Sequence, residues 1–201
     1  MEHVVLLDDA GRAIGTEPKA TVHTTVTPLH LAFSAYVFDR EGNVLITRRA
    51  LGKTTWPGVW TNSCCGHPAP DEPLEQAVRR RMIEELGIDT DDVSLVLPSF
   101  RYRAVMDSGI VENEICPVFR VLYNGPRPSP DPSEVESFEW IDWQDFLSRG
   151  LSGDREMSPW CREQVQQLRR LGRDPLRWPT APAAALPPAA REGSQLDGPL
   201  S

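Results

Sequence analysis

The chain has 201 residues, of which 40% are hydrophobic and 25% are charged, as is usual for globular proteins. Acidic residues outnumber basic ones, 29 to 21, and the net charge of −8 argues against binding nucleic acid through its phosphates. A small anionic substrate stays open, because a local group of cations can oppose the overall sign. No apolar run approaches the roughly 20 residues of a membrane span, and no signal-peptide pattern is present. We therefore expect a cytoplasmic protein whose four cysteines are thiols.

Strand-like patterns dominate the chain. They cover residues 4–7, 29–39, 44–48, 60–65, 93–106, 112–124 and 135–141. Helical patterns cover residues 73–86, 144–147 and 159–171. Runs of strands with few helices favour an α+β fold, a mixed β-sheet sandwich flanked by helices, over a doubly wound parallel sheet. We expect one domain over residues 1–172, followed by a Pro/Ala-rich tail over 173–201 that is disordered because it shows no apolar period.

Glycines and charged residues occur at set intervals in the predicted helix at 73–86 and in the residues on either side of it. They are Gly66, Glu72, Arg80, Arg81, Glu84, Glu85 and Gly87. This set resembles the Nudix box, a loop–helix–loop that binds divalent cations and diphosphates, except that Arg81 replaces a glutamate. Arg81 and Glu85 share a helix face, so the Arg81 guanidinium can bind a phosphate while Glu85 binds one Mg²⁺. The alternative, an amphipathic surface helix with an Arg–Glu pair, does not explain the box spacing.

A second group of residues has the chemistry of metal ligands. Cys65 and His67 lie two apart, as do Glu112 and Glu114, so each pair shares one face of an extended strand. Two glutamates on one face of an apolar strand are costly unless they are paired or bind metal. Histidines 23 and 30 complete an octahedral set for Mn²⁺, Mg²⁺ or Zn²⁺, although their spacing alone is also consistent with structural histidines. A tetrahedral structural zinc site is disfavoured because no Cys-x-x-Cys motif occurs.

Six segments are together similar to type I isopentenyl-diphosphate isomerases, a family with a Nudix-like fold, over about residues 3–170. The segments are Leu31-Ala-Phe-Ser34, Thr47-Arg-Arg-Ala-Leu51, Trp56-Pro-Gly-Val-Trp-Thr-Asn-Ser63, Cys65-Gly-His-Pro68, Phe100-Arg-Tyr-Arg-Ala104 and Gly109-Ile-Val-Glu-Asn-Glu114. That family moves a double bond, converting isopentenyl diphosphate to dimethylallyl diphosphate in isoprenoid biosynthesis. The resemblance implies a tertiary carbocation formed and lost by proton transfer.

The resemblance also implies a role for each matched residue. The catalytic residues would be Cys65, Glu114, Tyr102 and Trp160. The residues binding the substrate diphosphate would be Lys19, Arg49, Lys53 and Arg81. A first divalent metal, Mn²⁺ or Mg²⁺ with Zn²⁺ as a further possibility, would be held by His23, His30, His67, Glu112 and Glu114. A Mg²⁺ on the diphosphate would be held by Glu85 and the backbone carbonyl of Cys65.

Two other functions fit parts of the sequence. One is a Nudix hydrolase of a nucleoside or other diphosphate, which Arg81 and the Cys65/Glu114 pair argue against. The other is a catalytically silent binding module, which leaves a thiol, a carboxylate and a tyrosine in one pocket unexplained. The expected partner is a small isoprenoid diphosphate, without nucleic acid or a membrane span, in a monomer or weak dimer.

Overall fold

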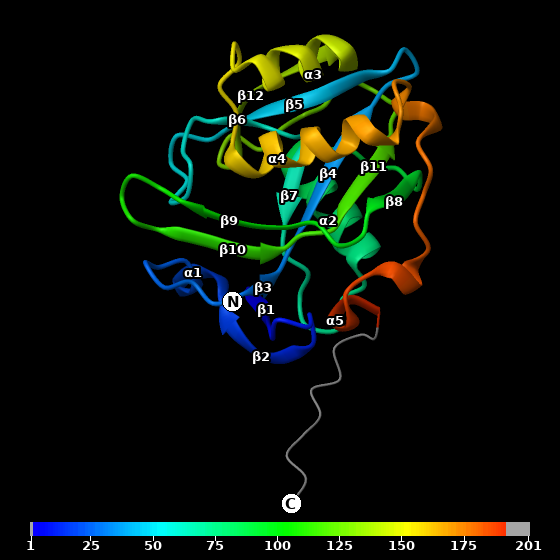
Figure 1. The fold of residues 1–201 in the computed structure, drawn as a ribbon. Helices are drawn as coiled ribbons and strands as arrows, with labels where there is room; N and C mark the ends of the chain where they lie inside the picture. The colour runs from blue at the N-terminus through cyan, green and yellow to red at the C-terminus, as the bar shows by residue number, and fades with distance from the viewer. Residues whose placement is uncertain (1, 192–201) are drawn as a thin grey trace, which may run out of the picture.

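The computed structural model describes residues 2–191, and Figure 1 shows two β-sheets with helices packed around them. The smaller sheet has the strand order β2-β1-β3-β10-β9. Its strands are β1 (His3–Leu7), β2 (Ala13–Pro18), β3 (His30–Leu31), β9 (Arg101–Val105) and β10 (Val111–Ile115). The larger sheet has the order β12-β5-β4-β11-β8, with β6 beside β5 and β7 beside β4. Its strands are β4 (Phe33–Phe38), β5 (Asn43–Arg49), β6 (Trp60–Thr61), β7 (Cys64–Gly66), β8 (Val93–Leu97), β11 (Val118–Leu122) and β12 (Val135–Asp142).

The prediction of an α+β fold with mixed sheets is confirmed. Strand β3 runs parallel to β10 and β4 runs parallel to β11, while neighbouring pairs such as β9/β10 and β4/β5 are antiparallel. The α-helices are α1 (Lys19–Val22), α2 (Leu74–Leu86), α3 (Trp143–Ser152), α4 (Pro159–Leu168) and α5 (Pro188–Arg191). The 3-10 helices are η1 (Arg169–Leu171), η2 (Pro175–Arg177) and η3 (Ala183–Ala185). None of the helices within residues 2–191 is long and apolar enough to cross a membrane.

Three of the long predicted strands are each divided between the two sheets. The expected strand over 29–39 becomes β3 and β4, and the expected strand over 112–124 becomes β10 and β11; the third, over 93–106, becomes β8 and β9. The second division falls at Pro117, which has no amide hydrogen for a sheet ladder. Ala32 marks the first division, and its amide donates to the carbonyl of Ile115 at 3.0 Å. The two crossing strands therefore pass from one sheet to the other side by side.

Helices α2 and α4 each cover one hydrophobic core. One face of α2 buries Leu74, Val78 and Met82 against β4 and β7, and the helix ends where Gly87 adopts a left-handed φ of 64°. Helix α4 buries Trp160 and other residues in a second cluster with α3 and β9. Burial of each large apolar side chain contributes roughly 1.5–3 kcal/mol. These two cores hold β7 and β9 in fixed positions, and both strands carry predicted site residues.

The expectation of a disordered tail is wrong for residues 173–191, which pack against the rest of the molecule (Figure 1). Trp178 is 3% exposed and stacks edge-on against Phe38 and Trp143, with ring centroids 5.4 and 5.1 Å away. The buried Arg120 donates to the carbonyls of Pro175 and Leu176 in η2, both at 3.2 Å. One buried indole and several backbone hydrogen bonds order the segment without any apolar period. Residues 192–201, also predicted as tail, lie outside the described residues.

Candidate active site

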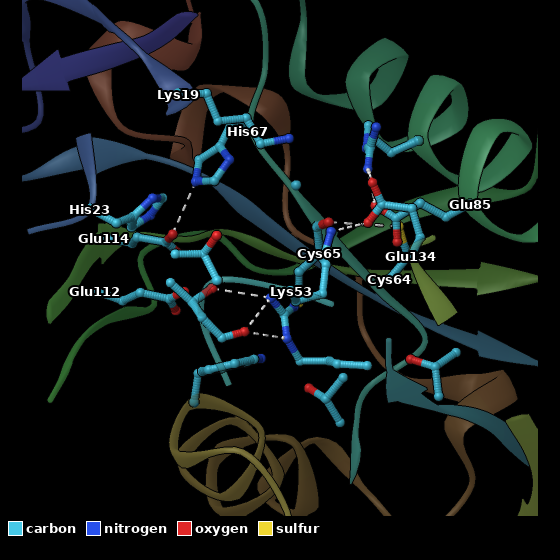
Figure 2. Close-up of a pocket in the computed structure, with 18 of the residues that line it drawn as sticks. Lys19, His23, Lys53, Cys64, Cys65, His67, Glu85, Glu112, Glu114 and Glu134 are labelled. Atoms are coloured by element: carbon cyan, nitrogen blue, oxygen red, sulfur yellow. Dashed lines mark hydrogen bonds and ion pairs between the residues drawn. The ribbon is translucent and has the colours of Figure 1, made fainter. Parts of the chain in front are cut away.

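A cavity of about 420 Å³ opens between the two sheets and α2. Every site residue predicted from the sequence lines it except His30, which is completely buried behind it. Figure 2 shows His23, His67 and Glu114 on one side of this cavity and Glu85 on the other, with Cys65 between them.

Strand register brings these residues together from distant parts of the chain. Glu114 on β10 is paired with His30 on β3 and with Tyr102 on β9. Cys65 on β7 is paired with Ser34 on β4. The crossing of β3 into β4 next to that of β10 into β11 therefore aligns the histidines, the glutamate and the thiol along one seam between the sheets.

Three histidines and Glu114 form a compact group of metal-ligand atoms. One ligand atom from each of His23, His30, His67 and Glu114 lies within 4.8 Å of all the others. Glu114 Oε1 is 3.1 Å from His67 Nε2 and 3.3 Å from His30 Nε2. The Nε2 atoms of His23 and His30 are buried and have no hydrogen-bond partner among the described residues. Unpaired buried nitrogens of this kind fit a bound cation, and imidazoles with a carboxylate suit Mn²⁺ or Zn²⁺.

Glu112, the fifth residue predicted to bind this metal, lies beside the group. Its carboxyl group is not among the clustered ligand atoms of the described residues, and its Oε2 lies 2.7 Å from the Tyr102 hydroxyl oxygen. The same hydroxyl is 2.9 Å from Glu114 Oε2. A phenol has one hydrogen, so both contacts are satisfied when one carboxyl carries a proton. Burial and the charge of Glu114 raise the pKa of Glu112 to about 7, which makes Glu112 the protonated partner.

The thiol of Cys65 lies next to an aromatic wall. Its sulfur is 3.2 Å from Asn62 Oδ1, and burial raises the pKa of Cys65 to about 12, so the thiol keeps its proton at neutral pH. The Trp160 ring lies 5.7 Å from the Tyr102 ring. The guanidinium of Arg49 lies 5.7 Å from the Trp160 ring centroid. The four residues predicted to be catalytic thus share one cavity.

Each cation predicted to bind diphosphate has an oxygen partner in this cavity. Lys19 Nζ is 2.6 Å from Glu2 Oε2, and Lys53 forms an ion pair with Glu134. Arg49 donates to the carbonyl of Thr55 at 2.9 Å. Arg81 forms ion pairs with Glu84 at 2.8 Å, with Glu134 at 3.2 Å and with Glu85. The cations are therefore held in place before any anion enters.

Comparisons with known proteins identify the family. A NUDIX domain matches residues 28–161. The isopentenyl-diphosphate Delta-isomerase of Saccharopolyspora erythraea is 56% identical over 190 residues, which are 94% of this chain and 97% of the relative. The enzyme of the same name from Rhizobium rhizogenes is 51% identical over 94% of this chain and 91% of the relative. The chain belongs to the isopentenyl-diphosphate Delta-isomerase family.

Solved structures agree on the fold of this isomerase. A protein from Deinococcus radiodurans superposes with a TM-score of 0.64 at 19% identity, covering 83% of this chain and 98% of that protein. A MutT protein from Methanosarcina mazei superposes with a TM-score of 0.58 at 21% identity, covering 71% of this chain and 94% of that protein. At these identities the likeness concerns the fold alone, and it confirms the prediction of a Nudix-like sandwich.

The Nudix box of the isomerase contains a structural clamp as well as site residues. Glu72 accepts hydrogen bonds from Arg80 at 2.7 and 2.8 Å and from the backbone amide of Ala69 at 2.8 Å. Arg80 also donates to the carbonyl of His67 at 3.3 Å. The spacing of Glu72 and Arg80 thus ties the loop that carries His67 to helix α2.

Several polar residues in or beside the cavity were not predicted. Glu2 and Glu134 pair with the cations, and Asn62 and Ser34 contact the sulfur of Cys65. Asn62 and Ser34 do fall inside the segments that resemble the isomerase family, but their residue types alone suggest no chemistry. Glu134 follows the proline-rich connector, where no motif draws attention to it.

Proposed function

We propose that this cavity catalyses the 1,3-allylic rearrangement of isopentenyl diphosphate to dimethylallyl diphosphate, with Cys65 and Glu114 as the acid–base pair. The observation that carries the proposal is the shared cavity, in which a thiol, a carboxylate, a phenol and an indole stand beside a group of cations. Membership of the isomerase family makes the protein an enzyme, and its relatives bear the name of this reaction.

The reaction needs one proton added and another removed. Protonation of the terminal alkene carbon leaves a tertiary cation at the branched carbon. Loss of a proton from the methylene on the other side of that carbon forms the new double bond, so the atoms balance and no redox cofactor is needed. One of Cys65 and Glu114 supplies the first proton and the other accepts the second. The Tyr102 hydroxyl, 2.9 Å from Glu114 Oε2, holds the Glu114 carboxylate in place.

The cation intermediate needs electron density without a nucleophile. The Trp160 ring is 2% exposed and gives an aromatic face, an interaction worth about 2 kcal/mol or more when water is excluded. A dry pocket also prevents capture of the cation as an alcohol. Trp160 therefore stabilises the cation and, by keeping water out, prevents formation of the alcohol side product.

We propose that Lys19, Arg49, Lys53 and Arg81 bind the diphosphate by exchanging their present oxygen partners for phosphate oxygens. A Mg²⁺ accompanying the diphosphate would be held by Glu85 and the Cys65 carbonyl. Mn²⁺ or Mg²⁺, with Zn²⁺ as a further possibility, is proposed for a site formed by His23, His30, His67, Glu112 and Glu114. When bound, that ion supplies positive charge which holds Glu114 in place and tunes its basicity.

The four cysteines are free thiols in the described structure, which supports a reducing, cytoplasmic location. A monomer or weak dimer is proposed as the working form. Analytical ultracentrifugation over a range of protein concentrations tests the oligomeric state directly.

One assay separates the isomerase from the alternatives. The full chain is incubated with isopentenyl diphosphate and Mg²⁺ in D₂O, and products are followed by NMR. We expect dimethylallyl diphosphate carrying deuterium. Release of phosphate without isomerisation would instead indicate a Nudix hydrolase, and an unchanged substrate would indicate a binding module.

A further inference from the structure

The side chain of Asn62 is completely buried between the catalytic thiol and the catalytic indole. Its amide nitrogen donates to the carbonyls of Ala35 at 3.0 Å and Cys64 at 2.8 Å. Because both partners are acceptors, the nitrogen must face them and the oxygen must face the opposite way. The orientation of the Asn62 amide is therefore determined by the backbone of β4 and β7.

The side-chain oxygen of Asn62 accepts hydrogen bonds from three donors. Trp160 Nε1 donates to Asn62 Oδ1 at 3.1 Å, and the thiol of Cys65 donates to the same atom at 3.2 Å. Thr61 Oγ1 lies 2.9 Å from it. Trp160 is 98 positions away in the sequence, so this single acceptor links β7 to helix α4 at the point where the reaction takes place.

We propose that Asn62 is a positioning residue that holds the Cys65 sulfur and the Trp160 ring in fixed relation through one amide oxygen. This inference rests on the proposed isomerase function. A cysteine side chain rotates about one bond among three staggered positions, and a hydrogen bond to Asn62 selects one of them. The indole hydrogen bond likewise selects the ring orientation that faces the substrate. Misplacement by about 1 Å can reduce a rate about 100-fold.

Comparison with the other hydrogen-bonding contact of the Cys65 sulfur shows what is particular to Asn62. Ser34 Oγ lies 3.4 Å from the Cys65 sulfur and accepts a hydrogen bond from Gln164 at 2.9 Å. This second contact approaches the sulfur but does not reach the indole. Among the described hydrogen bonds, Asn62 alone contacts both catalytic side chains, whereas the predicted diphosphate cations are bound elsewhere. A defect at Asn62 should therefore lower kcat and leave KM nearly unchanged.

Spectroscopy on the free enzyme tests the two hydrogen bonds without any substrate. In Asn62→Leu, a substitution of similar shape, we expect the indole N–H resonance of Trp160 to move upfield in a ¹H–¹⁵N spectrum. We also expect the S–H stretch of Cys65 to move to higher wavenumber. Trp160→Phe and Cys65→Ser assign the two signals. Unchanged signals in Asn62→Leu would overturn the proposal.

Ser63→Ala is the matched control. Ser63 is adjacent and equally buried, but among the described residues its hydroxyl bonds only to the backbone of Val37 and Leu45. The Ser63→Ala variant should therefore leave the Trp160 indole N–H resonance and the Cys65 S–H stretch unchanged. If Asn62→Leu fails to fold, the wild-type spectrum still decides, because an S–H stretch of Cys65 at the position of a free thiol would overturn the proposal.

Kinetics complete the test. We expect Asn62→Leu to lower kcat about 10- to 100-fold with KM changed less than about threefold, and Ser63→Ala to keep kcat within about threefold. An equal loss of kcat in both variants would show a merely structural role and overturn the proposal. Absence of isomerisation by the wild type would instead contradict the proposed function, and the spectroscopic result would stand by itself.

Discussion

Glu114 connects the histidine group to the proposed acid–base pair. Its Oε1 faces His67 and His30, while its Oε2 accepts a hydrogen bond from Tyr102. Burial acts to raise the pKa of Glu114, but the close imidazoles of His30, 3.3 Å away, and of His67, 3.1 Å away, hold that pKa well below its ordinary value. The carboxylate is thus ionised at neutral pH, whereas the Cys65 thiol is protonated. One side of the cavity can accept a proton and the other can give one.

The proposed acid–base pair predicts that turnover requires both Cys65 and Glu114. Cys65→Ala and Glu114→Gln should each lower kcat by about 10²- to 10⁴-fold, because each removes one proton-transfer group. The D₂O assay measures the loss, and circular dichroism checks that the fold persists. Cys161→Ala serves as control, since that buried thiol lies outside the cavity lining and should keep the wild-type kcat. Substantial turnover by either catalytic variant contradicts the assigned pair.

The histidine group makes a separate prediction about metal. A cation that binds only the folded protein should stabilise it by about 2.7 kcal/mol at 100 times its Kd. We expect the melting temperature of the chelator-treated protein to rise on addition of Mn²⁺, and to rise less in His23→Ala. His3→Ala is the control, because His3 is outside the clustered ligands. An equal rise in His23→Ala and wild type would exclude His23 as a ligand.

The predictability of a site residue depended on its chemical type. Cys65, His67 and Glu114 could be proposed from the sequence because thiols, imidazoles and paired carboxylates have few structural uses at such spacing. Asn62 was missed because an amide becomes informative only when its partners are known, and Trp160 is far away in sequence. Glu112 was placed among the metal ligands, but in the fold its carboxylate turns to Tyr102.

At the scale of elements, the strand patterns were visible but the sheet to which each belonged was not. A continuous apolar run such as residues 29–39 has the same pattern whether it stays in one sheet or crosses to another. The crossing depends on long-range pairing between β3 and β10, whose partners are about 84 positions apart, as between His30 and Glu114. Helix α2 of the Nudix box was easier to predict, because the glycine that ends it and the spacing of its charged residues are both local features of the sequence.

The clamp between Glu72 and Arg80 gives a prediction about pH. Burial acts to raise the pKa of Glu72, but the hydrogen bonds from Arg80 and the Ala69 amide lower it below its ordinary value. A depressed pKa in the folded state stabilises the protein above the unfolded value of about 4.3, and that stabilisation is lost as the pH falls through the folded value. Glu72→Gln should therefore lower the free energy of unfolding by about 1–3 kcal/mol at pH 7 and by less at pH 3.

Urea unfolding of wild type and Glu72→Gln at both pH values measures this difference. Glu75→Gln is a suitable control, because Glu75 is exposed in the first turn of the same helix. Equal free energies of unfolding of the two variants at pH 7 would contradict the stabilising role of the Glu72–Arg80 clamp. So would a loss of unfolding free energy in Glu72→Gln that grows as the pH falls.

At the scale of the whole molecule, residues 173–191 join the two sheets. The amide of Ala181 donates to the carbonyl of Leu95 in β8, on the larger sheet, at 2.8 Å. The amide of Ala189 donates to the carbonyl of Gly11, in the turn between β1 and β2 of the smaller sheet, at 2.9 Å. Figure 1 shows the segment running from the end of α4, past β8, to α5 beside the N-terminal strands. Because the cavity lies between the sheets, this segment supports the site from outside.

The anchoring of this segment by Trp178 gives the last prediction. Trp178→Ala should lower the free energy of unfolding by about 3–5 kcal/mol, because it empties a packed site beside Phe38 and Trp143. At about 2–4 °C for each kcal/mol, the melting temperature should fall clearly in a thermal scan. Truncation after Gly172 should lower the melting temperature at least as far. A melting temperature of Trp178→Ala within 2 °C (about 1 kcal/mol or less) of wild type would show that the segment merely lies on the surface.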